Sequence, residues 1–328
     1  MKPTPILLDV DAGVDDTLAI VFALLSPALS VRAITTVAGN VPVHACTRNV
    51  LLTLDLLSGK IPSFPIVAQG ASRPLKKKLF TAKEVHGSDG IGNASRLYNP
   101  PKFKAVPHPA VDVILELLRR EPNTTLVATG PLTNIASAIT KDFAVMKRTR
   151  EIVVMGGAFQ GVHNTGPVAE FNFYADPDAA DCVMQSGLPV RLIPLNVTEH
   201  CVLTLDDLRT IADPSLRRYL QRITKFYFDF HKRTANVTGG YLHDPLAVAS
   251  VAFPSLLKTH RGYVRVEWAG TYARGLSIFF PLLNIHKNAE LPGWVIRALR
   301  RKPSVRVATT VNANSFKQKF LGTLRRAR

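Results

Sequence analysis

The amino-acid sequence predicts an α/β protein with an open, mostly parallel central sheet and helices on both faces. Apolar runs of strand length alternate with amphipathic stretches of helix length, which is typical of parallel strands joined by helical crossovers. Polar residues with glycine or proline follow the ends of several apolar runs. Because ligands bind beyond the carboxyl ends of the strands in open α/β sheets, we expect the functional site at that edge.

The first part of the chain supplies three expected strands and two expected helices. The strands are predicted at residues 5–10, 31–37 and 64–67, and the helices at 15–25 and 41–57. A long polar, glycine-containing stretch without clear periodicity follows from residue 69 to residue 109. Stretches of this length within a compact domain are usually lids or binding loops.

The alternation resumes after this stretch. Strands are expected at residues 125–128, 151–155 and 190–194, and helices at 112–119, 132–139 and 177–185. Helices at 214–233 and 244–251 and a β segment at 263–268 complete the predicted elements. Because the sequence contains no internal repeat and no linker, we expect residues 1–328 to form a single domain.

The composition is that of a globular protein, with 46% hydrophobic and 20% charged residues among 328. The apolar stretches are too short to span a membrane, and the N-terminus lacks the apolar region of a signal peptide. These features favour a cytoplasmic or organellar location. The cysteines, Cys46, Cys182 and Cys201, are too scattered for a disulfide framework or a CxxC metal site, and we expect them to be reduced.

The formal net charge of +17 raises the question of nucleic-acid binding. The segment 297–328 contains ten lysines and arginines and no acidic residue. We expect it to be a solvated basic tail, with contact to phosphate, RNA or an organelle surface as the alternative. Because this tail carries more than half of the excess charge, nucleic acid is not an expected partner of the rest of the chain.

The strongest local feature is a cluster of four carboxylates in the segment Asp9-Val10-Asp11-Ala12-Gly13-Val14-Asp15-Asp16. Alternation along the strand places Asp9 and Asp11 on one side, and the turn brings Asp15 and Asp16 back beside them. Close negative charges repel unless a cation neutralises them, and Ca²⁺ and Mg²⁺ prefer oxygen ligands. The alternative, that carboxylates favour a helix N-terminus, explains only Asp15 and Asp16. The cluster therefore predicts a divalent-cation site.

The same segment resembles the N-terminal signature of the nucleoside hydrolase family, D-x-D-P-G-x-D-D, with Ala12 where the family usually has proline. Further matches follow in the family's order: Thr36-Val37-Ala38-Gly39-Asn40, His86-Gly87, Ala128-Thr129-Gly130-Pro131-Leu132-Thr133-Asn134, Val154-Met155-Gly156-Gly157, Ala169-Glu170-Phe171-Asn172, Asp176-Pro177 and His243-Asp244-Pro245. The resemblance implies a calcium-dependent hydrolase of the N-glycosidic bond of ribonucleosides, of the inosine-uridine preferring type.

For the metal, the resemblance implies a calcium ion held by Asp11, Asp16, the backbone carbonyl of Thr129 and Asp244. Such oxygen ligands suit Ca²⁺ better than Zn²⁺. Taken alone, Asp244 is better explained as a helix N-cap residue before Pro245, and only the whole set of matches favours a metal ligand. Hydrolysis through an oxocarbenium-like transition state needs an activated water. The resemblance implies that the calcium orients and acidifies this water, that Asp11 accepts its proton as general base, and that the anomeric centre inverts.

The resemblance also implies how the ribose is bound. Asp15 and Asn40 match residues that hold its 2′ and 3′ hydroxyls. The residues expected on the 5′ and 3′ side of the sugar and along the ribose pocket are Asn164, Glu170, Asn172 and Met155. Taken alone, Met155 is more often a core residue, and Glu170 and Asn172 are more often surface hydrogen-bonding groups.

The resemblance implies that His243 protonates the departing base, with His86 of the long loop nearby. A lone histidine is more often structural. The family often carries a tyrosine on the helix before the His-Asp-Pro motif, whereas this chain has Tyr227 and His231 there, with Tyr241 closer to the motif. This departure leaves the choice among inosine, guanosine, adenosine, uridine and cytidine open. We expect a role in nucleoside salvage, of purines including 6-oxopurines, and assembly into a homodimer or homotetramer, as is usual in the family.

Two other classes of protein compete with this hypothesis. A haloacid-dehalogenase-type phosphatase also begins with an Asp-x-Asp at the end of its first strand, but the sequence offers no convincing downstream lysine and paired acids. A basic nucleotide- or RNA-binding protein would explain the charge. Such a protein has no use for a carboxylate cluster, which repels phosphate. The same repulsion favours a neutral nucleoside over a nucleotide as substrate.

Overall fold

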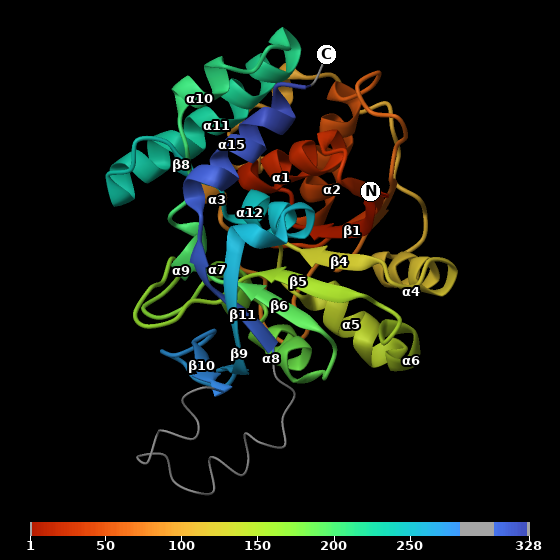
Figure 1. The fold of residues 1–328 in the computed structure, drawn as a ribbon, viewed down its shortest axis with the longest axis vertical. Helices are drawn as coiled ribbons and strands as arrows, with labels where there is room; N and C mark the ends of the chain where they lie inside the picture. The colour runs from red at the N-terminus through yellow and green to blue at the C-terminus, as the bar shows by residue number, and fades with distance from the viewer. Residues whose placement is uncertain (1, 283–304, 327–328) are drawn as a thin grey trace, which may run out of the picture.

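A nine-stranded sheet forms the centre of the computed structural model, which describes residues 2–282 and 305–326 (Figure 1). Its strands lie in the order β10-β9-β11-β6-β5-β4-β1-β2-β3. Their bounds are β1 Thr4–Val10, β2 Leu29–Thr36, β3 Ile66–Gln69, β4 Thr125–Ala128, β5 Glu151–Met155, β6 Val190–Ile193, β9 Leu257–Val266, β10 Ser277–Pro281 and β11 Val305–Val311. Neighbours from β11 to β3 pair in parallel, whereas β9 is antiparallel to β11 and β10. The predicted, mostly parallel sheet is confirmed.

Helices cover both faces of this sheet (Figure 1). One face carries α1 Val14–Leu25, α2 Val43–Leu56, α11 Pro214–Ala235, α12 His243–Ala252 and α15 Ala313–Leu324, and the other carries α4 Ala110–Arg120, α5 Thr133–Lys141, α6 Phe143–Met146 and α8 Pro177–Gln185. In β1, Ile6 and Leu8 pack into the first core and Leu7 into the second, because successive side chains of a strand point to opposite faces. A strand buried on both sides is typical of a parallel sheet between two helical layers.

Short elements connect these layers. They are α3 Lys83–His86, α7 Phe171–Ala175, α9 Leu195–Thr198, α10 Leu205–Arg209, the two-stranded sheet of β7 Val202–Leu203 and β8 Gly240–Tyr241, and the 3-10 turns Ser95–Leu97 and Pro254–Leu256. The long polar stretch predicted at 69–109 contains α3 and the first of these turns. No helix in the described part of the chain has the length and apolarity to cross a membrane.

The C-terminal segment departs from the prediction. Residues 305–311 form β11, which lies inside the sheet between β6 and β9. The following helix, α15, buries Phe316 and Phe320, and the Phe320 ring lies 5.6 Å from that of Phe22 on α1. The expectation of a solvated tail is therefore wrong for residues 305–324, while 297–304 and 327–328 lie outside the described residues. The β segment predicted at 263–268 is the end of the longer strand β9.

Candidate active site

The turn between β1 and α1 positions the first site residues. Gly13 is the N-cap residue of α1, and its N–H donates to Asp16 Oδ2 at 2.8 Å. A Cβ atom at Gly13 would lie 2.5 Å from Asn40 Nδ2 and 2.7 Å from His86 Nδ1, so any other residue would displace these two side chains. Ala12 has a φ of 20°, which a proline ring cannot adopt. The turn therefore differs at this residue from the proline-containing form usual in the family that the sequence resembles.

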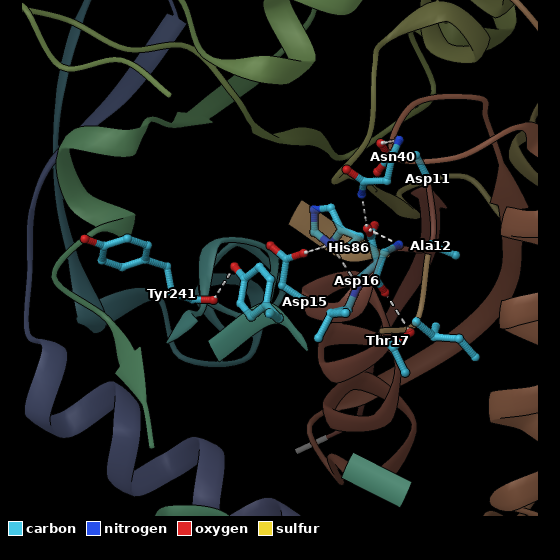
Figure 2. A network of polar contacts seen from close by, with 12 residues as sticks. Asp11, Ala12, Asp15, Asp16, Thr17, Asn40, His86 and Tyr241 are labelled. Atoms are coloured by element: carbon cyan, nitrogen blue, oxygen red, sulfur yellow. Dashed lines mark hydrogen bonds and ion pairs between the residues drawn. The ribbon is translucent and has the colours of Figure 1, made fainter. Parts of the chain in front are cut away.

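Four buried carboxylates meet at this turn. Oxygen atoms of Asp15, Asp16 and Asp244 lie within 4.8 Å of one another. Asp11 Oδ2 accepts the Asn40 N–H at 2.8 Å, and Asn40 Nδ2 donates to Asp16 Oδ2 at 3.1 Å. Figure 2 shows Asn40 joining Asp11 to Asp16, with the ring of His86 beside Asp15. The predicted proximity is thus present for Asp11, Asp15 and Asp16 but not for Asp9, and the tightest group contains Asp15 in addition to the predicted ligands Asp16 and Asp244.

The electrostatics of this cluster favour a bound cation. Burial, reinforced by neighbouring carboxylates, raises the pKa of Asp11 and Asp244 well above the usual range and that of Asp15 to about 8. Burial also raises the pKa of Asp16. Within the described ranges, no lysine or arginine forms an ion pair with any of the four. An all-oxygen, uncompensated set of this kind is suited to a hard divalent cation.

Thr129 contributes to the same place through two different atoms. Its hydroxyl donates to Asp16 Oδ1 at 2.7 Å. Its backbone carbonyl, the predicted ligand, accepts the Asn172 Nδ2–H at 2.7 Å. A carbonyl oxygen has a second lone pair, so this bond leaves it able to bind a cation. Asp9 lies apart from the cavity: its Oδ1 accepts bonds from Thr35 at 2.6 Å and Asn134 at 2.8 Å, and it is fully buried.

A cavity of about 660 Å³ opens above the carboxylates. Its lining includes every residue predicted for the site except Asp16, which lies buried beneath it: Asp11, Asp15, Asn40, His86, Thr129, Met155, Asn164, Glu170, Asn172, Tyr227, His231, His243 and Asp244. These residues come from β5, from α1, α3, α7, α11 and α12, and from the loops at the carboxyl ends of the strands. The predicted position of the site at this edge of the sheet agrees with the structure.

The short helix α7 brings Asn172 into the cavity. Asn172 Nδ2 donates to the carbonyls of Thr129 and Met155, at 2.7 and 3.1 Å. Glu170 is the N-cap residue of α7, and its carboxylate accepts three backbone N–H groups, those of Asn172, Gly157 and Phe173. Burial nevertheless raises the pKa of Glu170 to about 7. In the protein alone, Glu170 therefore holds the helix that presents Asn172.

Aromatic and imidazole rings also line the cavity, beginning with His86, whose Nδ1 lies 3.8 Å from Asp15 Oδ1. Centroid distances are 5.4 Å for His86–Tyr227, 4.3 Å for Tyr227–His231, 4.9 Å for His231–Tyr241 and 5.3 Å for Tyr241–His243. The Tyr227 hydroxyl donates to the Tyr241 carbonyl at 2.9 Å (Figure 2). Flat rings of this kind suit a planar heterocycle.

Burial keeps these histidines neutral. It lowers the pKa of His86 and of His243 to about 3, and it also lowers the pKa of His231. His86 Nδ1 accepts the Val14 N–H at 3.1 Å, and His243 Nδ1 lies 2.7 Å from Thr198 Oγ1. At neutral pH the rings can therefore donate or accept hydrogen bonds, but they carry no positive charge.

Sequence reasoning missed several cavity residues. Phe80, Glu84, His163, Glu199 and Phe230 line the cavity, and Thr198 lies behind His243. Most of them lie in loops or short elements without periodicity. For Phe230 alone a signal existed, because it directly precedes His231 on a predicted helix.

Comparisons with known proteins agree with this geometry. The sequence model of the inosine-uridine preferring nucleoside hydrolase family matches residues 6–318. A probable uridine nucleosidase 2 of Arabidopsis thaliana is 36% identical over 314 residues, which cover 94% of this chain and 93% of the relative. A pyrimidine-specific ribonucleoside hydrolase of Salmonella arizonae is 39% identical, with 84% of this chain and 88% of the relative covered.

Solved structures give the same result. A plant nucleoside hydrolase superposes with a TM-score of 0.89 at 33% identity, covering 98% of this chain and 99% of the other. A purine-preferring ribonucleoside hydrolase from Gardnerella vaginalis has a TM-score of 0.85 at 32% identity, with the same coverage of both chains. The chain belongs to the inosine-uridine preferring nucleoside hydrolase family and is a hydrolase of N-glycosyl bonds.

Proposed function

We propose that this protein hydrolyses pyrimidine ribonucleosides to free base and ribose, with a calcium ion held by the carboxylate cluster. The observation that carries this proposal is the cavity itself, whose lining combines the buried carboxylates Asp11, Asp15 and Asp244 with neutral rings. The hydroxyls of a ribose suit the carboxylates, and a planar base suits the rings. Among the residues that the structure describes, the lining contains no lysine or arginine, which agrees with an uncharged nucleoside as substrate.

Calcium fits the donor set. Asp11, Asp16, Asp244 and the Thr129 carbonyl would hold it, with Asp15 close enough to contribute. All of these donors are oxygens, and calcium accepts six to eight of them in flexible geometry. When bound, the ion would supply charge that stabilises the ionised carboxylates and lowers the pKa of a coordinated water.

The remaining chemistry belongs to the protein. Asp11 would accept the proton of the attacking water, and its orientation is set by the bond that Oδ2 accepts from the Asn40 N–H. Asp15, Asn40 and Asn172 would bind the ribose hydroxyls, and Met155 would pack against the sugar. Glu170 and Asn164 would bind the 5′ side, in addition to their bonds within the α7 cap. Direct displacement by one water would invert the anomeric centre.

At the base, His243 and His86 would assist departure. Because burial lowers their pKa to about 3, their contribution in the free protein would be hydrogen-bond donation by a neutral ring. Hydrogen bonds to developing negative charge are stronger than those to a neutral group. Tyr227 and His231 would contact the ring of the base.

The choice of pyrimidine follows the names of relatives. The Arabidopsis thaliana relative is called a uridine nucleosidase and the Salmonella arizonae relative a pyrimidine-specific hydrolase, whereas a structural neighbour is called purine-preferring. The sequence relatives have the higher identity. Purine salvage, the expectation from the sequence, is the alternative. Assembly into a homodimer or homotetramer stays a prediction, which light scattering can test.

One experiment tests the proposal. Release of ribose and free base is measured with uridine, cytidine, inosine, guanosine and adenosine, first with calcium, then after chelation, and then with magnesium in its place. We expect calcium-dependent release that is fastest with a pyrimidine nucleoside. Faster release from inosine or guanosine would refute the pyrimidine preference, and full activity after exhaustive chelation would refute the metal.

A further inference from the structure

We propose that His86, His231 and His243 form a base-reading set of two hydrogen-bond donors and one acceptor, and that this set selects uracil over cytosine. The proposal rests on the proposed function, because it specifies the substrate of the same site. Its starting point is the partner atom of each histidine Nδ1. The hydrogen bond that one nitrogen of a neutral imidazole makes fixes the tautomer of the ring.

The tautomer of His86 is fixed by a donor. A backbone N–H can only donate, so the bond from Val14 N–H to His86 Nδ1 at 3.1 Å makes Nδ1 the acceptor. The proton of the neutral ring then lies on Nε2. His86 therefore offers an N–H donor at its other nitrogen.

His231 has the opposite tautomer. Its Nδ1 lies 2.9 Å from the carbonyl oxygen of Tyr227, and a carbonyl can only accept. The ring proton must lie on Nδ1. Because burial also disfavours a second proton on this ring, Nε2 of His231 is an acceptor.

His243 receives its tautomer from Thr198. Thr198 Oγ1 is 2.7 Å from His243 Nδ1 and 3.5 Å from the Leu195 carbonyl, and we assign its single proton to the shorter of these two contacts. Thr198 is fully buried at the end of α9. Asn196 fixes this helix by accepting the Phe159 N–H and donating to the Phe159 carbonyl, both at 2.9 Å. His243 thus offers Nε2–H, like His86.

The three rings occur in a defined order. Contacts run from His86 through Tyr227 to His231, and from His231 through Tyr241 to His243. All three histidines line the cavity, and none of their Nε2 atoms has a hydrogen-bond partner among the residues that the structure describes. In the order of these ring contacts, the three Nε2 atoms are donor, acceptor and donor.

Uracil presents the complementary edge. Its O2 and O4 are acceptors and its N3–H lies between them as a donor, whereas cytosine presents two acceptors and an amino group. Two N–H groups on O2 and O4 would also stabilise the negative charge that spreads to these oxygens as the base departs. A site built to hydrogen-bond a substrate group rejects an analogue that lacks it far more strongly than an apolar pocket does.

The test compares substrates within one protein preparation. The calcium-loaded wild type is assayed with uridine, cytidine and 3-methyluridine, which lacks the N3–H. We expect kcat/KM for uridine to exceed that for each of the other two by at least about 10-fold. In His231→Phe the uridine-to-cytidine ratio should fall toward 1, whereas in the matched control His44→Phe, an exposed position on α2, it should not change.

A second pair of variants tests the buried hydroxyl. Thr198→Val keeps the shape but removes the bond to His243 and should lower kcat/KM for uridine by about 10-fold, while Thr198→Ser keeps the bond and should retain most of it. If His231→Phe hydrolyses neither nucleoside, the ratio of kcat/KM values is replaced by the ratio of the affinities for uridine and cytidine. These affinities are measured by calorimetry in an Asp11→Asn background, with and without His231→Phe. Equal use of uridine and cytidine by the wild type, or an unchanged ratio in His231→Phe, would overturn the inference.

Failure of the proposed function is recognised separately. p-Nitrophenyl riboside has no uracil edge, and its calcium-dependent hydrolysis by the wild type reports the ribosyl chemistry alone. If it is hydrolysed but uridine is not preferred, only the base-reading set is wrong. If neither it nor any nucleoside is hydrolysed, the proposed function itself is wrong.

Discussion

Replacing Glu170 by glutamine should remove a loss of stability that the wild type suffers as the pH rises. Burial places the pKa of Glu170 at about 7 in the folded protein, against 4.5 for an unperturbed glutamate. Between these values the unfolded chain releases its proton while the folded protein retains it. The free energy of unfolding of the wild type therefore falls from about pH 4.5 and levels off above about pH 7.

The size of this effect follows from the same two values. The whole difference corresponds to about 3.4 kcal/mol, of which about 2.5 kcal/mol falls between pH 5 and pH 8. Glutamine does not titrate, so the variant should lack this component. It should also carry a pH-independent cost of about 1–3 kcal/mol, because its amide nitrogen replaces one of the two oxygens that accept backbone N–H groups in the α7 cap.

Urea unfolding of both proteins at pH 5, 6, 7 and 8, with calcium at saturation, measures the difference. Titration of the carboxylate cluster is common to both proteins and cancels when one curve is subtracted from the other. Glu84→Gln, at an exposed position on α3, serves as the control and should parallel the wild type. If the curves of wild type and Glu170→Gln also run parallel from pH 5 to pH 8, the reasoning is refuted. The three backbone N–H groups would then lower the pKa of Glu170 by as much as burial raises it.

Two further substitutions test the site and the C-terminal segment. Asp11→Asn should lower kcat by at least about 100-fold. Its amide oxygen can still accept the Asn40 N–H, but the side chain cannot take a proton from water. Near-normal kcat in the calcium-loaded variant would contradict the role of Asp11 as base. Phe320→Ala should lower the free energy of unfolding by about 3–5 kcal/mol, because it removes a buried ring. The control Gln318→Ala, at an exposed position, should change it by less than about 0.5 kcal/mol. Equal effects of the two substitutions in urea unfolding would mean that α15 is not part of the folded core.

Sequence patterns predicted the strands that form the centre of the sheet because those strands are buried on both faces. Ile6, Leu7 and Leu8 leave no other interpretation of β1. The pattern was weaker in β11, where Val305 and Val307 are buried and Arg306 is exposed. In α15, Phe316 and Phe320 have the helical spacing of four, but the many basic residues around them suggested a solvated tail. Charge density is thus a poor guide to burial where apolar residues recur at the right interval.

The site shows a similar division. Asp11, Asp15 and Asp16 are close in the chain, so a strand and a turn suffice to predict that they meet. Asp244 joins them only through the packing of α12 against α1, and a motif match was needed to place it. The partners of His231 and His243, which are Tyr227 and Thr198, leave no signature in the sequence because a tautomer depends on a single atom of a neighbour.

The carboxylates and the histidines of the cavity depend on each other. A cation among the carboxylates would add positive charge within the same cavity as the histidines, which further disfavours a charged imidazole. Protonated rings are thus poor candidates for base activation here, whereas neutral rings with fixed N–H groups need no change of charge. The backbone amide of Val14 illustrates this link, since Val14 lies between Asp11 and Asp15 at the start of α1 and its N–H also sets the tautomer of His86. A distortion of this turn would therefore impair both water activation and base recognition, and losses in the two functions should appear together in variants of Gly13.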